Sequence, residues 1–337
     1  MVEAIDIPHP RDVFGFEQGE AVEHAFLDAL GRGRLHHAWL LTGPEGVGKA
    51  TFAFRAARRL MGAAPDPAFG PMGSRPDHPV SRQIAARSHP DIMVLEREVE
   101  GSKPRKVIPV DEARKLPEFF SKAPASAPYR VAIVDSVDDM NPNAANALLK
   151  TLEEPPERGV LFLISHSPGG LLPTIRSRCR RLRFAPWSEA AVAEFVGRHS
   201  DANDEDRLRL ARMSGGAPGR ALDLLARKAL EADDAARELL RALPSLDRGA
   251  VQALADGFRG GEGMAKFSLL IERLADQIHR RVTADALDGD PPEAVWAETW
   301  SRLNDLPGEV EGLNLDRADA LWAAVADLRA AAAEPGH

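Results

Sequence analysis

Residues 43–50 read Gly-Pro-Glu-Gly-Val-Gly-Lys-Ala and follow a short apolar run at residues 39–42. A helical pattern begins directly after this stretch and covers residues 49–61. A glycine-rich loop between a strand and a helix lets backbone N–H groups close around phosphates, and a lysine at its end reaches the terminal phosphates. The stretch therefore predicts a P-loop. Its predicted phosphate-binding residues are Gly43, Gly46, Gly48 and Lys49.

Other apolar runs at residues 91–95, 130–135 and 160–165 have the length and composition of buried strands. Helical patterns at residues 110–120 and 143–154 lie between them. Strands that alternate with helices of this length indicate an α/β domain, and nearly continuous apolar strands indicate a parallel sheet that is covered on both faces. We therefore expect an α/β P-loop domain in the first half of the chain.

The last position of the P-loop pattern departs from the rule. A hydroxyl there normally binds the Mg²⁺ that bridges the phosphates, but this chain has Ala50. Thr51 offers a hydroxyl one residue later, and on a helix it points about 100° away. The loop is thus expected to keep its shape while binding nucleotide weakly or not at all.

A second element of the expected site is also incomplete. The apolar run at residues 130–135 ends in Asp135, the position of a metal-associated aspartate. The next residue, where an active ATPase of this architecture usually carries a glutamate that orients the attacking water, is Ser136. Asp138 and Asp139 lie on the following turn, and we interpret them as solvated or capping residues. These departures predict a site that does not hydrolyse ATP.

Residues 176–183 contain five arginines. We interpret most of them as the solvated face of an edge strand. Arg178 differs because Ser177 and Cys179 flank it. A guanidinium supplied in trans can stabilise the charge that develops in phosphoryl transfer on a neighbouring subunit. Cys179 itself has no activating partner in the sequence, and we interpret it as a small buried residue.

Composition narrows the class of protein. The 337 residues carry a formal charge of −8, but residues 1–185 have a net charge of +2 and residues 186–337 a net charge of −10. An acidic second half argues against a large duplex-binding surface there, because such surfaces need clustered cations. No apolar stretch reaches the roughly 18 residues of a membrane span, and the first residues lack a secretory pattern. We expect a cytoplasmic protein without a membrane partner.

Residues 62–90 are rich in proline, glycine and alanine and are expected to form a long loop or insertion. Asp77, His78 and His89 lie in or beside it, but their spacing is a poor match to a metal site. After residue 186 the strand patterns stop and helical ones continue. The apolar residues Leu315, Ala318, Leu321, Trp322, Val325 and Leu328 predict a buried helical stripe.

Together these motifs resemble those of the AAA+ subunits of bacterial DNA polymerase III clamp loaders. The strongest match is residues 146–156, Asn-Ala-Leu-Leu-Lys-Thr-Leu-Glu-Glu-Pro-Pro, followed by residues 172–179, Leu-Pro-Thr-Ile-Arg-Ser-Arg-Cys. Residues 36–43 also resemble the family's approach to the P-loop, and residues 216–220 its lid turn. The resemblance implies that Arg178 is the arginine finger that reaches the ATP site of an adjacent motor subunit.

The resemblance also implies an organisation and a set of partners. It implies an AAA+ α/β domain at residues 1–185, a small helical lid domain at 186–243 and a helical collar domain at 244–337. The implied partners are the gamma or tau and delta subunits and, through the complex, the sliding clamp and primed DNA. Many relatives carry a four-cysteine zinc module, but Cys179 is the single cysteine here, so we expect no zinc.

Three functions remain open at this point. Ala50 and Ser136 favour a non-hydrolysing stator subunit. Such a subunit is not an enzyme on its own and requires no cofactor. Its complex is nevertheless classified with the DNA-directed DNA polymerases, which are nucleotidyltransferases. The alternative is an ATP-hydrolysing motor subunit of the gamma/tau type or another AAA+ ATPase. A DNA-binding accessory protein with a vestigial P-loop is the third, and the nearly neutral first half disfavours it.

Overall fold

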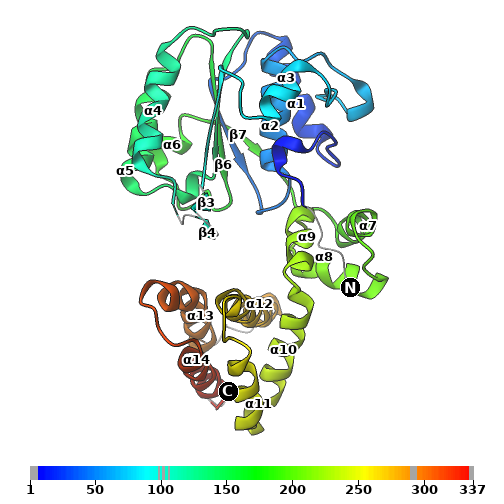
Figure 1. Ribbon diagram of the computed structural model, residues 1–337, viewed down its shortest axis with the longest axis vertical. Coiled ribbons are helices and arrows are strands. Elements are labelled where there is room, and N and C mark those ends of the chain that lie inside the picture. Colours follow the sequence, from blue (N-terminus) through cyan, green and yellow to red (C-terminus); the bar gives the residue numbers. More distant parts are fainter. Residues whose placement is uncertain (1–6, 98, 101–102, 105–106, 289–293, 334–337) are drawn as a thin grey trace. The chain divides into compact units, whose positions relative to one another are not determined.

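The computed structural model describes residues 7–97, 99–100, 103–104, 107–288 and 294–333. The chain forms two compact units, residues 1–223 and 224–337 (Figure 1). The first unit contains a mixed α/β core and three further helices, and the second contains helices alone in the described residues. The division into domains at 1–185, 186–243 and 244–337 stays a prediction. None of the described helices has the length and apolar content needed to cross a membrane.

A parallel sheet of five strands, in the order β2-β5-β6-β1-β7, forms the core of the first unit. Its strands are β1 (Ala38–Thr42), β2 (Ile92–Glu96), β5 (Arg130–Asp135), β6 (Gly159–Ser165) and β7 (Arg180–Arg183). Register pairs such as Trp39 with Phe162 and Glu96 with Asp135 align the carboxyl ends of the strands at one edge. The structure thus confirms the predicted parallel α/β fold.

Alternate residues of each strand enter two apolar layers, as a sheet covered on both faces requires. Trp39, Leu41 and Phe162 belong to one layer, and Leu40 and Leu163 belong to the other. On the first face lie α1 (Glu20–Gly31), α2 (Lys49–Leu60) and α3 (Pro79–Ala85), and on the second lie α4 (Val110–Ser121), α5 (Pro142–Glu153) and α6 (Pro173–Arg176) (Figure 1).

The stretch at residues 62–90 is not simply a loop, because it contains η2 (Pro67–Phe69) and helix α3. Helix α3 begins with a proline at its first position, and the ring of His78 accepts a hydrogen bond from Val80 N at 3.2 Å. Its seven residues are too few for the helical period to stand out against a proline- and glycine-rich background. A short two-stranded ribbon, β3 (Val99–Glu100) and β4 (Lys103–Pro104), follows β2.

A buried ion pair anchors this insertion to the core. Arg55 on α2 donates to Glu23 on α1 at 2.6 Å, and both side chains are almost wholly buried. The same guanidinium donates to the carbonyl of Phe69 at 2.6 Å, and Met72 N donates to the second carboxylate oxygen of Glu23 at 3.3 Å. The pair therefore connects α1 and α2 to the backbone of the insertion.

The remaining elements are short 3₁₀ helices and α-helices. The first unit also has η1 (Pro10–Asp12), η3 (Val137–Asp139), α7 (Glu189–His199) and α8 (Asp204–Met213), and α9 (Pro218–Ala226) spans the boundary. The second unit consists of α10 (Ala229–Ala242), η4 (Leu243–Ser245), α11 (Arg248–Asp256), α12 (Gly263–Asp288), α13 (Ala294–Gly312) and α14 (Arg317–Ala333).

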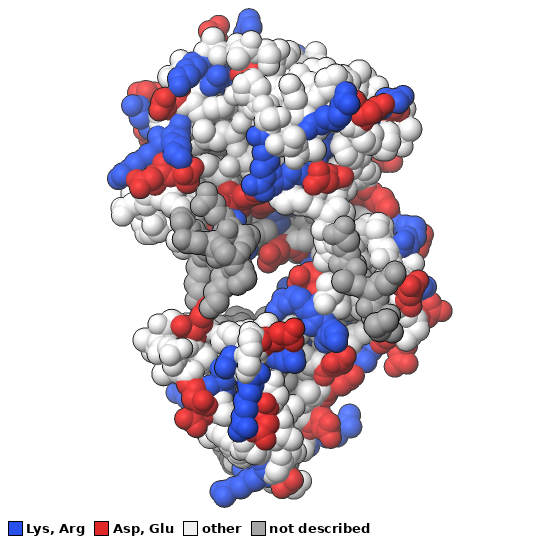
Figure 2. Space-filling view, in the orientation of Figure 1, with Lys and Arg blue, Asp and Glu red and all other residues white. Residues whose placement is uncertain are grey.

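The second unit has a core of its own, built largely on α12 and α14. Leu321, Val325 and Leu328 of the predicted stripe are buried, whereas Leu315 precedes α14 and is 46% exposed. The stripe prediction is therefore wrong at Leu315, because the helix begins two residues after it. Positive and negative side chains are interspersed over the visible faces of both units (Figure 2).

Candidate nucleotide site and arginine finger

The predicted P-loop lies between β1 and α2, at the carboxyl edge of the sheet. Gly48 adopts a φ of +101° as the cap of α2, and Gly46 adopts a φ of +78°. Side chains other than hydrogen are rarely tolerated there. Gly43, which follows β1 directly, lies against the carbonyl of Phe184. The loop thus has the backbone shape that its glycines predict.

The side chain of Lys49 is bound to its own loop. This first residue of α2 is 3% exposed, and its Nζ donates to the carbonyls of Gly43 at 2.7 Å and Pro44 at 2.5 Å. Burial lowers the pKa of Lys49 to about 8, although the nearby carboxylates of Asp135 and Glu45 oppose the shift. An ammonium that reaches a phosphate from this position has to leave these two carbonyls.

Ala50 and Ser136, the two positions that depart from the pattern of an active ATPase, have structural roles. Ala50 packs against the apolar layer that contains Phe52, and Thr51 is half-buried on the next position of α2. Ser136 is buried, and its hydroxyl donates to Asp139 Oδ2 at 3.0 Å in a capping box at η3. The capping interpretation of Asp139 is therefore confirmed.

Asp138, by contrast, connects η3, which follows β5, to the end of β6, and is therefore not simply a solvated residue. Its carboxylate accepts hydrogen bonds from Ser165 Oγ at 2.9 Å and from His166 N at 2.6 Å. Burial, together with the positive charge of Lys49, lowers the pKa of the His166 imidazole. Sequence reasoning missed His166, because nothing local marks the residue after β6 as a neighbour of η3.

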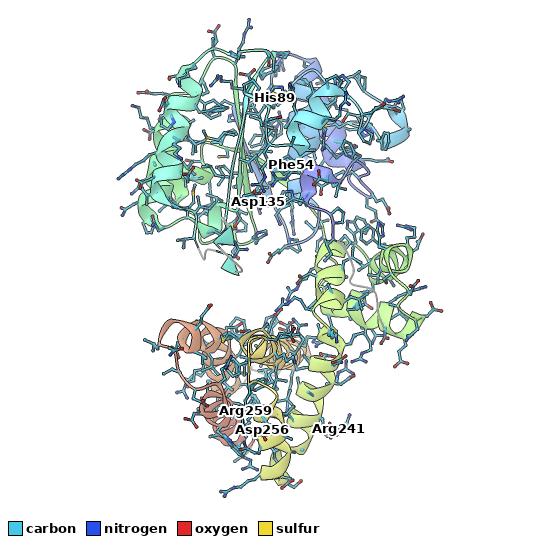
Figure 3. The ribbon with its side chains drawn as sticks, viewed as in Figure 1. Phe54, His89, Asp135, Arg241, Asp256 and Arg259 are labelled. Atoms are coloured by element: carbon cyan, nitrogen blue, oxygen red, sulfur yellow. The ribbon has the colours of Figure 1, made fainter. Side chains whose placement is uncertain are left out.

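Asp135 ends β5 at the same edge of the sheet (Figure 3). Burial, with a contribution from the neighbouring Glu96, raises the pKa of Asp135 to about 6, and the charge of Lys49 only partly opposes this shift. A carboxyl group with such a pKa carries less negative charge near neutral pH than an ordinary aspartate. Burial therefore stabilises the neutral form of Asp135 relative to an ordinary aspartate, although most of the group is still ionised at pH 7.

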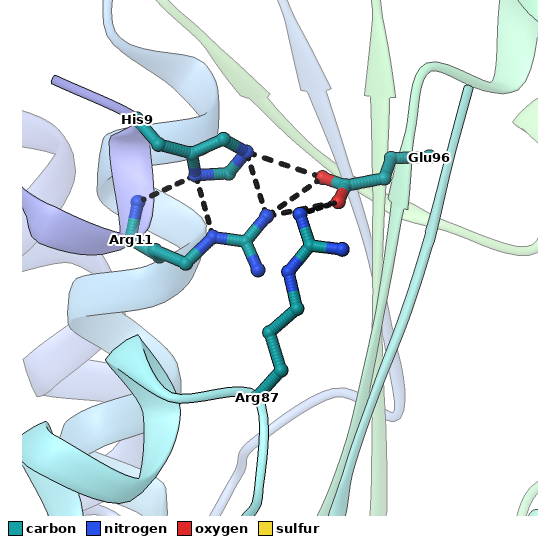
Figure 4. Close-up of polar contacts among 4 residues, drawn as sticks. All are labelled: His9, Arg11, Arg87 and Glu96. Atoms are coloured by element: carbon teal, nitrogen blue, oxygen red, sulfur yellow. Dashed lines mark hydrogen bonds and ion pairs between the residues drawn. The ribbon is translucent and has the colours of Figure 1, made fainter. Parts of the chain in front are cut away.

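Glu96, the register partner of Asp135, belongs to a polar cluster that the sequence did not reveal (Figure 4). Arg11 Nη2 and Arg87 Nη2 lie 2.8 and 2.7 Å from Glu96 Oε1, and His9 Nε2 lies 3.3 Å from Oε2. Burial opposes ionisation, but these partners lower the pKa of Glu96 to about 2. The cluster fixes η1 and the end of α3 to the edge strand β2.

Helix α9 approaches the P-loop closely. Gly219 N donates to the carbonyl of Gly46 at 2.9 Å, and a Cβ placed on Gly46 would lie 2.4 Å from the backbone nitrogen of Arg220. The family resemblance assigned residues 216–220 to a lid turn, but no pattern in the sequence indicated this contact. The beginning of α9 and the P-loop thus form one packed structure.

Arg178 lies between α6 and β7, and its side chain is 36% exposed. Two other arginines of this stretch pack against the sheet, since Arg180 covers the ring of Trp39 at 4.9 Å and Arg181 donates to Thr42 Oγ1 at 3.0 Å. Strand β7 is an edge strand, as predicted. Burial raises the pKa of the Cys179 thiol to about 12, consistent with an inert residue.

The residues considered for a metal site serve separate purposes. Asp77 pairs with Arg75 at the surface, His78 caps α3, and the ring of buried His89 accepts a hydrogen bond from Asp91 N at 3.2 Å. Within the described ranges, no group of three or more His, Cys, Asp or Glu side chains is placed to hold a metal ion. The structure thus places these three residues in different local contacts.

Comparison with known proteins adds a family to this geometry. A family model described as "DNA polymerase III, delta subunit" matches residues 18–188. The DNA polymerase III subunit delta' of Pseudomonas aeruginosa is 40% identical over 189 residues, which cover 56% of this chain and 55% of that protein. The subunit gamma/tau of Mycobacterium bovis is 30% identical over 287 residues, or 82% of this chain and 47% of that protein.

Among solved structures, a gamma subunit-related protein of Thermotoga maritima covers 93% of this chain and 99% of its own, with 21% identity and a TM-score of 0.48. The matches span about half the length of the curated relatives. The family match covers just over half of the chain, from the helix before the P-loop to the residues after β7. The chain therefore belongs to the DNA polymerase III delta' family of clamp-loader subunits.

Proposed function

We propose that the chain is a non-hydrolysing stator and assembly subunit of the DNA polymerase III clamp loader. In this role it helps to load the sliding clamp onto primed DNA, and it supplies Arg178 to the ATP site of a neighbouring gamma or tau subunit. It also contacts the delta subunit. It needs no cofactor of its own, and any binding of ATP or ADP at its P-loop is weak.

One contrast carries this proposal. Lys49 is buried and bound to two carbonyls of its own loop, and Ala50 packs its methyl group where a magnesium-binding hydroxyl is expected. Arg178 is also bound within this chain, through Glu153 and Thr174, but it differs from Lys49 in keeping 36% of its side chain exposed. The chain is thus poorly equipped to turn over a nucleotide and well equipped to offer a guanidinium to one.

The chemistry asked of Arg178 is electrostatic. Phosphoryl transfer spreads negative charge over the oxygens of the transferred group. An arginine supplied in trans stabilises that charge and thereby accelerates the reaction by about 10³–10⁵-fold. The planar guanidinium can donate two parallel hydrogen bonds to phosphate oxygens, which a lysine cannot reproduce.

A motor subunit is the second candidate, because the gamma/tau relative aligns with 82% of this chain. An ATPase of that kind needs a hydroxyl ligand for magnesium and an acid that orients water. Here these positions hold Ala50 and Ser136, and Ser136 donates its hydroxyl to Asp139. The non-hydrolysing role therefore agrees better with the site.

The test is steady-state ATP hydrolysis in the presence of clamp and primed DNA. The isolated chain, its gamma and delta partners and the reconstituted complex are compared, and the complex is prepared with the native chain or with Arg178→Ala. We expect the isolated chain to be silent and the Arg178→Ala complex to lose turnover several-fold, because the site that this chain faces loses its arginine.

Arg176→Ala serves as the matched control, since Arg176 is an exposed arginine two residues away. It should leave turnover unchanged, and gel filtration should show that all three complexes assemble. Turnover by the isolated chain well above that of a Lys49→Ala variant would identify a motor subunit instead. Equal activity of the native and Arg178→Ala complexes would remove the arginine-finger role.

A further inference from the structure

The guanidinium of Arg178 is already bound by its own chain. Its Nη2 lies 3.1 Å from Glu153 Oε1, and its Nη1 donates to the carbonyl of Thr174 at 3.1 Å. Glu153 is the last residue of α5, and Thr174 belongs to α6, so two helices supply the acceptors. Both terminal nitrogens of the arginine are therefore engaged within this chain.

The strength of this arrangement is limited by water. The side chains of Glu153 and Arg178 are 52% and 36% exposed, so solvent screens their attraction. Exposed ion pairs of this kind shift an equilibrium by at most about fivefold. A carboxylate carries one negative charge, whereas a terminal phosphate carries more and offers three acceptor oxygens. A phosphate at this place can thus displace the carboxylate from the guanidinium.

We propose that Glu153 is an intramolecular latch for Arg178. The latch holds the guanidinium beside the end of α5 in the free chain and releases it when the phosphates of a neighbouring nucleotide arrive. Glu153 is a positioning residue that acts through Arg178, and this inference rests on the trans role proposed above for that arginine. It predicts that the carboxylate competes with the phosphate for the same guanidinium.

The chain offers a closely matched control. Glu154 follows Glu153 directly, is also exposed and carries the same charge, but the structure gives it no ion pair with Arg178. Glu153→Gln and Glu154→Gln each remove one negative charge from the end of α5. Any difference between them reports the contact with Arg178 and not the change in net charge.

The first experiment uses the isolated full-length chain and tests the latch without any partner. Phenylglyoxal modifies accessible guanidinium groups, and peptide mass spectrometry separates Arg178 from Arg176. We expect Glu153→Gln to raise the labelling rate of Arg178 about two- to fivefold, the range that an exposed ion pair allows. Glu154→Gln should leave it unchanged, and Arg176 should be labelled equally in all three proteins.

The second experiment measures the ATP concentration that gives half-maximal turnover in the reconstituted complex with clamp and primed DNA. Glu153→Gln should lower this concentration about two- to fivefold, because the phosphate no longer competes with a carboxylate. Higher salt should shrink the difference. In an Arg178→Ala background, Glu153→Gln should have no effect, since the latch then has nothing to hold.

The outcomes separate the two proposals. If Glu153→Gln leaves Arg178 labelling unchanged, or weakens the use of ATP as Arg178→Ala does, the latch is overturned while the trans role of Arg178 stands. If Arg178→Ala itself has no effect on turnover, the proposed function fails, and the release step of the latch fails with it. Faster labelling together with a lower ATP requirement supports both.

Discussion

At the scale of single residues, the carboxyl edge of the sheet contains ionisable groups whose pKa values are shifted by burial. Lys49 and Asp135 lie there together, and burial lowers the pKa of the lysine to about 8 and raises that of the aspartate to about 6. An active site of this type needs both groups ionised around a metal and a triphosphate. At pH 7 both groups nevertheless remain mostly ionised, because this pH lies below the pKa of the lysine and above that of the aspartate.

The shift of Asp135 predicts a dependence of stability on pH. Because its folded pKa of about 6 exceeds the ordinary value of 3.8, its contribution to stability is fully present below about pH 4 and is lost as the pH rises through 6. Asp135→Asn should therefore raise the melting temperature at pH 7.5 and change it much less at pH 4. The gain in free energy of unfolding is at most about 3 kcal/mol.

Thermal unfolding followed by circular dichroism at both pH values measures this effect. Asp201→Asn is the control, because Asp201 is exposed. A destabilisation by Asp135→Asn at pH 7.5 would show that its charged form is needed for folding, contrary to this expectation.

At the scale of elements, the ion pair of Glu23 and Arg55 connects α1, α2 and the insertion. Removing one partner of a buried pair leaves an uncompensated charge, which costs about 3–5 kcal/mol. Glu23→Ala should lower the free energy of unfolding by about this amount in urea titrations. Asp28→Ala on the same helix should cost less than about 1 kcal/mol, because its pair with Arg32 is exposed.

Hydrogen exchange gives a local measure of the same change. The amide of Met72, which donates to the Glu23 carboxylate, should lose protection in Glu23→Ala and keep it in Asp28→Ala. Equal costs for the two substitutions would mean that the insertion is held by its apolar contacts and not by the ion pair.

At the scale of the whole molecule, the chain has separate apolar cores in its two units. Phe162 on β6 and Leu274 on α12 are fully buried in different cores. Phe162→Ala should cost about 3–5 kcal/mol and Leu274→Ala about 2–5 kcal/mol, because each leaves a cavity. Each substitution should raise hydrogen exchange within its own unit. Loss of protection in both units from either substitution would show that they unfold together.

The sequence by itself determined the parallel sheet, the P-loop and its two incomplete positions. These features are local, since an apolar run of four to six residues marks each inner strand and the glycines of residues 43–48 mark the loop. Helix α3 was not predicted, because seven residues in a proline-rich stretch show almost no periodicity. The exposure of Leu315 was not predicted, because periodicity does not show at which residue a helix begins.

Only the tertiary structure decided which groups meet. Gly46 contacts Gly219 across 173 positions, Glu96 gathers His9 and Arg11, and Glu153 holds Arg178. Such pairs depend on which strands are neighbours and on where each helix ends, and no local pattern records either. The resemblance thus singled out Arg178 as the candidate for a role in trans, and the fold showed that Glu153 and Thr174 bind its guanidinium.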